Sequence, residues 1–468
     1  MTDKELYERL SYKPKNAYYE MADDEIRIML EMCDEYRNFL DEGKTERECI
    51  IISEKLAIKN GFVKLEDKNE LKPGDKVYKI NRDKNILLAV IGTDDPENGY
   101  NIVGAHVDSP RLDLKQNPLY ESNEMALLKT HYYGGIKKYQ WTAIPLALHG
   151  VVYTRSGEKI EVKIGEKDTD PVFTITDLLP HLAKDQMAKK LADGIEGEAL
   201  NVLVGGMGVK CEDVSEKVKF KILSILNSLY GIKEEDFFTA ELEVVPAFKA
   251  RNVGLDESLI GAYGQDDRVC AFTSLKSIFD IEVPKKTAIC LLVDKEEIGS
   301  TGNTGMLSRF FEMMLNELTL KIKPEANIIS LNNAISNSSC LSSDVSAAVD
   351  PNYETVYEKN NSAFIGHGMI LMKYTGSRGK SGASDASAEF VHEVISILNN
   401  NGIIWQSGEL GKVDQGGGGT IAMYVGNLNM NVIDCGVPVL SMHSPFEVTA
   451  KTDIYMAYKS YMAFYNDR

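Results

Sequence analysis

Residues 287–297 read TAICLLVDKEE, an apolar run of strand length that ends directly in a cluster of acidic residues. A short continuous apolar run is typical of a strand whose two faces are both buried. Residues 305–322, which follow, carry apolar side chains at helical spacing, and residues 327–331 again resemble a strand. Alternation of this kind indicates a sheet with helices on both faces. We therefore expect an α/β fold with a mixed sheet built around this strand.

The rest of the chain extends the same pattern. Further strands are predicted at residues 85–92, 101–105, 369–374, 403–406, 420–425 and 437–442, and helices at residues 21–40, 45–60 and 384–400. The stretch between about residues 111 and 250 has a different pattern. Its short β-like runs, at residues 146–153 and 159–164, are followed by a helical pattern at residues 217–230. We interpret residues 111–250 as an inserted, β-rich domain that divides a discontinuous main domain, residues 1–110 and 251–468.

Composition excludes several classes of protein. The chain has 468 residues, 43% of them hydrophobic and 26% charged, which is a globular balance and is long enough for two or three domains. Its formal net charge of −18 disfavours contact with nucleic-acid phosphates. No apolar run approaches the length of a membrane span, and the charged N-terminus lacks the apolar core of a signal peptide. We expect neither a nucleic-acid nor a membrane partner.

The seven cysteines are scattered and form no CxxC pair. This usage is typical of reduced thiols in a cytoplasmic protein. A cysteine-based zinc site is therefore not expected, and any metal must be held by histidine and carboxylate side chains.

Candidate ligands follow the predicted strands. His106 and Asp108 come after residues 101–105, and side chains two residues apart in extended chain point the same way. The imidazole could bind a metal while the carboxylate holds its other nitrogen. The alternative is an ordinary hydrogen-bonded pair at a strand end.

Paired acids offer further chemistry. Glu296 and Glu297 could supply one metal ligand and one general base, or simply form a solvated turn. Asp266 and Asp267 could bridge two metals, or lie in a surface turn where Arg268 pairs with an acid.

Two more candidates complete the set. Asp344 follows residues 327–331 after a polar stretch, and His443 ends the predicted strand at residues 437–442. Imidazole and carboxylate ligands together suit zinc, manganese or cobalt.

A basic loop lies between a predicted strand and a predicted helix. Residues 374–381 nearly match a phosphate-binding pattern, but Tyr374 stands where the first glycine should be. We favour a loop near the active site in which Lys373, Arg378 and Lys380 provide a positive field for a carboxylate of the substrate.

Five motifs, in order, carry a resemblance that extends over nearly the whole chain. They are GAHVDSPRLD (104–113), GQDDRVCAF (264–272), LLVDKEEIGSTG (291–302), SSDVSAAVDPNY (342–353) and MHSPFEV (442–448). This series resembles the aspartyl aminopeptidase family of dinuclear zinc metallopeptidases. The resemblance implies a catalytic domain of that type formed by residues 1–110 and 251–468, with residues 111–250 as its dimerisation domain.

The resemblance also implies roles for individual residues. His106 would bind one metal with Asp108 as its supporting partner, and Asp266 would bridge both metals before a cis peptide bond to Asp267. Glu296 would be the general base and Glu297 a metal ligand. Asp344 would complete the shell of the first metal, and His443 that of the second. His181, in the segment PHLA of the insert, and Lys373 would contact substrate.

The implied activity is removal of N-terminal residues from peptides, with Asp or Glu preferred, through a water held by two divalent ions. Zinc is the expected metal, with cobalt or manganese as alternatives. The implied assembly is a tetrahedral dodecamer. Two other functions stay open at this point: the same chemistry with a neutral N-terminal preference, and a catalytically silent scaffold on a peptidase fold.

Overall fold

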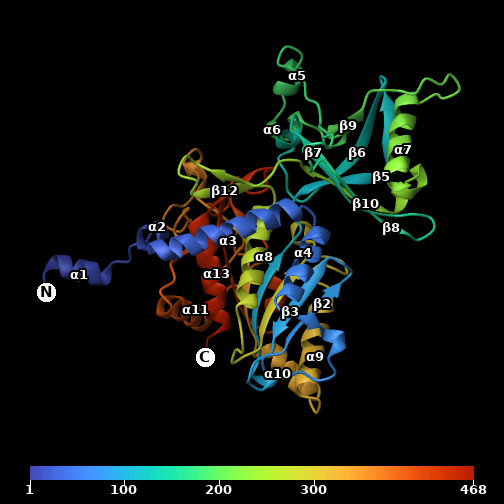
Figure 1. The fold of residues 1–468 in the computed structure, drawn as a ribbon. Coiled ribbons are helices and arrows are strands. Elements are labelled where there is room, and N and C mark those ends of the chain that lie inside the picture. The colour runs from blue at the N-terminus through green and yellow to red at the C-terminus, as the bar shows by residue number, and fades with distance from the viewer. Residues whose placement is uncertain (468) are drawn as a thin grey trace.

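The computed structural model describes residues 1–467 and is organised around a nine-stranded mixed sheet (Figure 1). In spatial order its strands are β1 (Val63–Lys64), β2 (Lys76–Asn81), β3 (Asn85–Val90), β13 (Ala288–Val293), β4 (Asn101–His106), β14 (Ser339–Ser343), β20 (Asn431–Gly436), β16 (Met369–Met372) and β18 (Trp405–Ser407). The central strands β13, β4, β14 and β20 are parallel, so their carboxyl ends meet at one edge. The expected α/β fold with a mixed sheet is confirmed.

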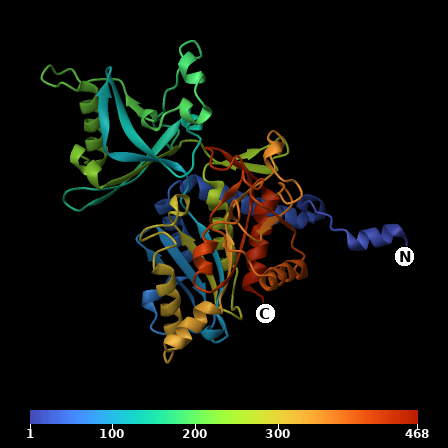
Figure 2. The same ribbon diagram turned by 180° about the vertical axis from the view of Figure 1, so that it is seen from behind.

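Both faces of the sheet are buried, as its continuous apolar strands require. Along β13, Cys290 and Leu292 belong to one hydrophobic cluster, while Leu291 and Val293 belong to the other. The first cluster is covered by α3 (Asp23–Glu42), α4 (Glu46–Lys59), α8 (Gln265–Phe279), α11 (Ala388–Asn400) and α13 (Lys451–Tyr465), and the second by α9 (Phe310–Ile322), α10 (Ile328–Ser336) and α12 (Ala422–Gly426). Figures 1 and 2 show these two helical layers from opposite sides. Across residues 1–467, no helix is long and apolar enough to cross a bilayer.

A second, six-stranded antiparallel sheet stands apart from the first and takes all its strands from residues 111–246 (Figure 1). Its order is β8 (Lys159–Ile164), β7 (Leu146–Tyr153), β10 (Ala240–Pro246), β5 (Arg111–Ser122), β6 (Met125–Tyr133) and β9 (Val202–Gly205). Helix α7 (Lys217–Tyr230) packs on it through Leu223 and Leu226, around a hydrophobic cluster distinct from those of the large sheet. The short helices α5 (Lys184–Met187) and α6 (Leu191–Gly194) lie in the connection from β8 to β9.

A five-stranded sheet brings together segments that lie far apart in the chain. It consists of β11 (Arg251–Val253), β12 (Leu259–Ala262), β22 (Glu447–Ala450), β21 (Pro438–Leu440) and β15 (Ser346–Ala347). Two short strands, β17 (Gly376–Ser377) and β19 (Gly417–Gly418), pair separately. At the N-terminus, α1 (Asp3–Leu10) extends away from the body, and α2 (Ala17–Glu20) leads into α3 (Figure 2).

Two predicted strands are wrong. Residues 327–331 begin α10, because the side chain of Asn327 accepts hydrogen bonds from the backbone N–H groups of Ile329 and Ser330 and caps a helix. Residues 420–425 lead into α12, where the hydroxyl of Thr420 accepts a hydrogen bond from the N–H of Ala422. Short apolar runs do not distinguish a strand from a buried helix.

Candidate metal centre

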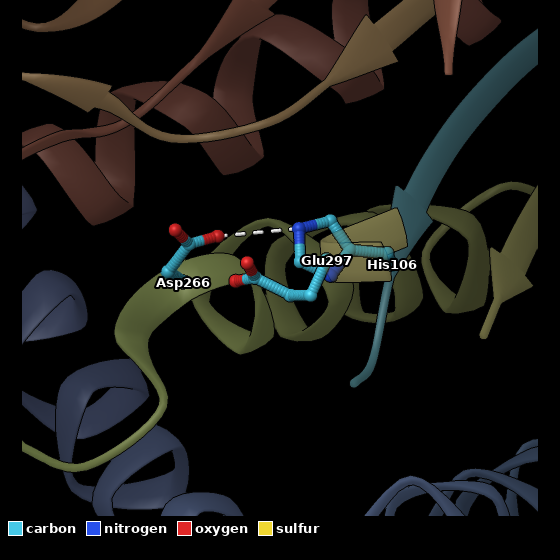
Figure 3. Close-up of side chains that lie close together, drawn as sticks. All are labelled: His106, Asp266 and Glu297. Carbon is cyan, nitrogen blue, oxygen red and sulfur yellow. Dashed lines mark ion pairs between the residues drawn. The ribbon is translucent and has the colours of Figure 1, made fainter. Parts of the chain in front are cut away.

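Two histidines and several carboxylates converge at the carboxyl edge of the central parallel strands. His106 is the last residue of β4, Asp344 follows β14, and Glu296 and Glu297 follow β13. Because Val293 pairs with His106 in register, the two strands end side by side. Asp266 arrives at the start of α8, and His443 in the turn after β21. Figure 3 shows His106, Asp266 and Glu297 turned toward one another.

The first histidine faces three carboxylates. Nε2 of His106 lies 3.2 Å from Oδ1 of Asp266, 3.7 Å from Oδ1 of Asp344 and 3.9 Å from Oε2 of Glu296. The imidazole is 2% exposed, so these groups meet away from bulk water. The arrangement gives one group of nitrogen and oxygen donors around a common point.

The second histidine shares one of those carboxylates. Nε2 of His443 lies 3.0 Å from Oδ2 of Asp266 and 3.5 Å from Oε2 of Glu297. The two oxygens of Asp266 therefore face different histidines. The peptide bond from Asp266 to Asp267 is cis, as the resemblance implied.

Both imidazole rings are oriented by backbone carbonyls. Nδ1 of His106 lies 3.0 Å from the carbonyl oxygen of Asp108, and Nδ1 of His443 lies 2.8 Å from that of Gly135. A carbonyl oxygen can only accept a hydrogen bond, so Nδ1 donates in both cases. When the ring is neutral, each Nε2 then presents a lone pair to the cluster. The neutral imidazole is the form that binds a metal.

Two further carboxylates hold the backbone around the ligands. Asp108 accepts hydrogen bonds from the N–H groups of Glu296 (3.1 Å) and Glu297 (3.2 Å). Glu447 accepts from the N–H groups of Asp266 (3.1 Å) and His443 (2.7 Å). Each carboxylate thereby fixes two candidate site residues.

The cluster carries more negative charge than its imidazoles can neutralise. Burial, together with the charges of Asp344 and Asp108, raises the pKa of Glu296 to about 8. Burial lowers the pKa of His443, but its hydrogen bond to Asp266 and the charges of Glu297 and Glu447 raise it further, to about 11. Bound cations would relieve this imbalance.

Unpaired polar atoms test whether the residues fit a metal. Among the described residues, buried side-chain atoms without a hydrogen-bond partner include Nε2 of His106, Oδ1 of Asp266, Oε1 of Glu297 and Oδ1 of Asp267. Buried polar atoms are normally satisfied, so such a group needs an explanation. Ligand atoms of three sets, His106–Asp266–Glu297, His106–Glu296–Asp344 and Asp266–Asp267–Asp344, lie within 4.8 Å of one another. The donors fit zinc, which binds imidazole and carboxylate ligands.

A cavity of about 510 Å³ opens onto this cluster, and Glu296, Glu297, Asp344 and His443 line it. Part of its wall comes from the loops that carry β17 and β19, which contribute Arg378, Lys380, Lys412, Tyr374 and Glu409. The segment that resembles a phosphate-binding loop therefore forms part of this wall.

Neither of the two predicted substrate contacts lines this cavity. Lys373 stands between the lining residues Met372 and Tyr374, and its Nζ pairs with Asp385 at 2.8 Å. His181 is exposed just before α5, and none of the contacts that build the cluster involves it.

Sequence reasoning missed three residues of the site: Glu447, Tyr133 and Gly135. Glu447 stands inside the motif MHSPFEV, four residues after His443, so the motif itself was a signal. Tyr133 donates its hydroxyl hydrogen to Oδ2 of Asp108 at 2.8 Å. No spacing or motif pointed to Tyr133 or Gly135.

Known proteins resemble this chain over nearly its whole length. Residues 39–465 match the model of the family described as aminopeptidase I zinc metalloprotease (M18). A "Probable M18 family aminopeptidase 1" of Clostridium acetobutylicum is 50% identical over 97% of this chain and 98% of its own length.

Solved structures share the fold. The crystal structure of an M18-family aminopeptidase from Thermotoga maritima superimposes with a TM-score of 0.94, at 45% identity, over 98% of this chain and 100% of that one. The structure of a Saccharomyces cerevisiae protein, described as the mApe1 dodecamer, has the same fold at 20% identity, with a TM-score of 0.74 over 92% of this chain and 95% of that one. The chain belongs to the M18 family of zinc metalloproteases and is an aminopeptidase.

Proposed function

We propose that this aminopeptidase works with two metal ions per subunit, one bound by His106 and Asp344, the other by His443 and Glu297, with Asp266 shared between them. The observation that carries the proposal is the position of Asp266, whose two oxygens face the Nε2 atoms of the two histidines at 3.2 and 3.0 Å. Zinc is the expected ion, because the donors are nitrogen and oxygen and the family is a zinc family. Cobalt and manganese suit the same donors.

Glu296 is proposed as the general base. Divalent ions, when bound here, would lower the pKa of water and polarise the scissile carbonyl. Glu296 lines the cavity and its side chain is 16% exposed, against 4% for Glu297, so it can reach both water and substrate. It takes a proton from the attacking water and passes it to the leaving amine. Asp108 holds the backbone of Glu296 in place for this transfer.

The uncompensated carboxylates suit the free amino group of a peptide, which restricts cleavage to the N-terminal residue. In the same cavity, Arg378 and Lys412 offer cations to an acidic side chain or a nearby carboxylate. These cations support the proposed preference for N-terminal Asp or Glu. A preference for neutral N-terminal residues, cleaved by the same chemistry, is the alternative.

Self-association is proposed for the whole enzyme. The dodecamer reported for the yeast protein of the same fold supports a homo-oligomer, in which residues 111–250 form a dimer contact and His181, exposed in this chain, reaches substrate in a neighbouring subunit. A tetrahedral dodecamer is the specific form proposed. A cytoplasmic location is proposed from the free cysteines, of which all but Cys211 are buried.

The experiment strips the protein with a chelator, restores it with zinc, cobalt or manganese, and measures initial rates on peptides beginning with Asp, Glu, Leu, Lys or Ala. Metal-restored cleavage led by Asp or Glu is expected. If the restored protein cleaves the Leu peptide fastest, the two-metal chemistry stands and the proposed preference for Asp or Glu is wrong. A folded protein inactive with every metal would overturn the catalytic proposal in favour of a silent scaffold.

A further inference from the structure

The six-stranded sheet reaches into the metal centre. Strand β6 ends at Tyr133, and the chain then passes the cluster through Gly134 and Gly135. The hydroxyl of Tyr133 donates to Oδ2 of Asp108 at 2.8 Å, and the carbonyl of Gly135 accepts from Nδ1 of His443 at 2.8 Å. Residues 133–135 thus contact both Asp108, which supports His106, and the candidate ligand His443 itself.

Tyr133 is held rigidly enough to orient Asp108. It is 9% exposed, and the guanidinium of Arg111 lies 3.9 Å from the centre of its ring. Arg111 stands opposite Tyr133 in the β5–β6 register and is itself fixed by ion pairs to Asp113 (2.8 Å) and Glu243 (3.2 Å). The position of the Tyr133 hydroxyl therefore depends on where the six-stranded sheet lies.

The two glycines let the backbone approach the ligands closely. Gly134 has φ +74°, and a Cβ there would lie 3.3 Å from Oε2 of Glu297. A Cβ on Gly135 would lie 3.2 Å from Nδ1 of His443. Such contacts are tighter than ordinary packing, so a side chain at either position would press on a ligand.

We propose that Tyr133 and Gly135 are positioning residues, each serving chiefly one of the two metal subsites. Tyr133 orients the carboxylate of Asp108, which lies 3.3 Å from Nδ1 of His106 and accepts hydrogen bonds from the backbone N–H groups of Glu296 and Glu297. Tyr133 therefore serves chiefly the His106 subsite and reaches the other subsite through Glu297. Gly135 fixes the tautomer and ring position of His443 and so serves the other. The inference rests on the proposed two-metal function. It makes metal affinity depend on how the six-stranded sheet sits against the large one.

The test uses the full-length metal-free protein titrated with zinc against a competing chelator. Zinc-edge anomalous diffraction at buffered zinc then shows which subsite fills. Y133F is expected to weaken the His106 subsite and, through Glu297, the other subsite to a smaller degree, whereas G135A is expected to weaken the His443 subsite. The effect on the subsite that each residue chiefly serves should be about 10–100-fold, as for other residues that support metal ligands. Y132F, which changes the neighbouring 44%-exposed tyrosine, and G206A, where a Cβ meets open space, are the matched controls.

The outcomes separate this inference from the proposed function. If wild type takes up two zinc ions and both variants bind them with wild-type affinity, the inference is wrong. If each variant weakens both subsites equally while lowering the melting temperature, the two residues act only as general structural supports, and the inference is again wrong. If wild type itself takes up no zinc at these positions, the two-metal proposal fails.

Discussion

Oδ1 of Asp108 accepts a hydrogen bond from the backbone N–H of Glu296 at 3.1 Å, so a residue that follows β4 holds the start of the turn that follows β13. Oδ2 of the same carboxylate accepts from the N–H of Glu297 at 3.2 Å. The ring of His106 also lies against Asp108, with Nδ1 3.3 Å from Oδ1. One buried carboxylate thereby sets the spacing between a candidate ligand on one strand and the proposed base on its neighbour.

Replacing Asp108 with Asn should therefore weaken metal binding and slow turnover together. An amide offers one acceptor oxygen and places an NH₂ group against an N–H donor, so at least one of these bonds is lost. We expect zinc affinity to fall by about 10–100-fold. Chelator competition measures the affinity, and D193N, in the exposed helix α6, is the control. Unchanged affinity in D108N would contradict the supporting role.

The E296Q variant should separate catalysis from metal binding. Glutamine keeps the size of the side chain but cannot accept the proton, so kcat should fall by about 10²–10⁴-fold. The number of zinc ions per subunit, measured by mass spectrometry of the metal, should stay as in wild type. E312Q, on the outer part of α9, should leave both quantities unchanged. Near-normal kcat in E296Q would remove Glu296 as the base.

The H443A variant should lose one metal ion and keep the other. His443 contacts Asp266 and Glu297, whereas His106 and Asp344 form the other group of donors. After equilibration with zinc and desalting, we expect about one ion per subunit in place of two. H392A, which changes an exposed histidine on α11, should retain two. Two tightly held ions in H443A would show that His443 is not a ligand.

A buried histidine away from the metal centre should make stability depend on pH. His149 on β7 lies between Glu48 (3.0 Å) and Glu166 (3.1 Å), which joins the six-stranded sheet to α4. Burial lowers the pKa of His149, but its bonds to these two glutamates raise it more, so the net shift is upward from 6.5. Burial raises the pKa of Glu48 and of Glu166, but His149 and nearby lysines lower it more, to about 2, so both stay ionised.

The sign of the effect follows from this upward shift. The stabilisation by His149 is complete below its unfolded pKa of about 6.5 and is lost as the pH rises through the higher folded value. At about pH 6, H149Q should melt roughly 3–6 °C below wild type, and this difference should shrink as the pH is raised. Thermal unfolding across the pH range measures it. A difference that grows with pH would contradict the assignment.

Much of the candidate site was predictable because its residues directly follow strands. His106 and Glu296 stand after apolar runs that form strands, and parallel strands end at a common edge. Asp344 follows β14, a polar strand that the sequence did not predict. The predicted strand at residues 327–331 was wrong because Asn327 caps a helix there, and the one at residues 420–425 was wrong because its short apolar run belongs to the buried helix α12. Tyr133 and Gly135 could not be found in the same way. Their contacts arise from how one sheet docks on another, which leaves no periodic signal in the sequence.

The proposed function places Asp266 between two metal ions, and zinc-edge anomalous diffraction from crystals of the zinc-restored protein tests this placement. We predict two peaks roughly 3.5–4 Å apart, one beside His106 and Asp344, the other beside His443 and Glu297, with Asp266 contacting both. A single peak, or two peaks that do not share Asp266, would contradict it.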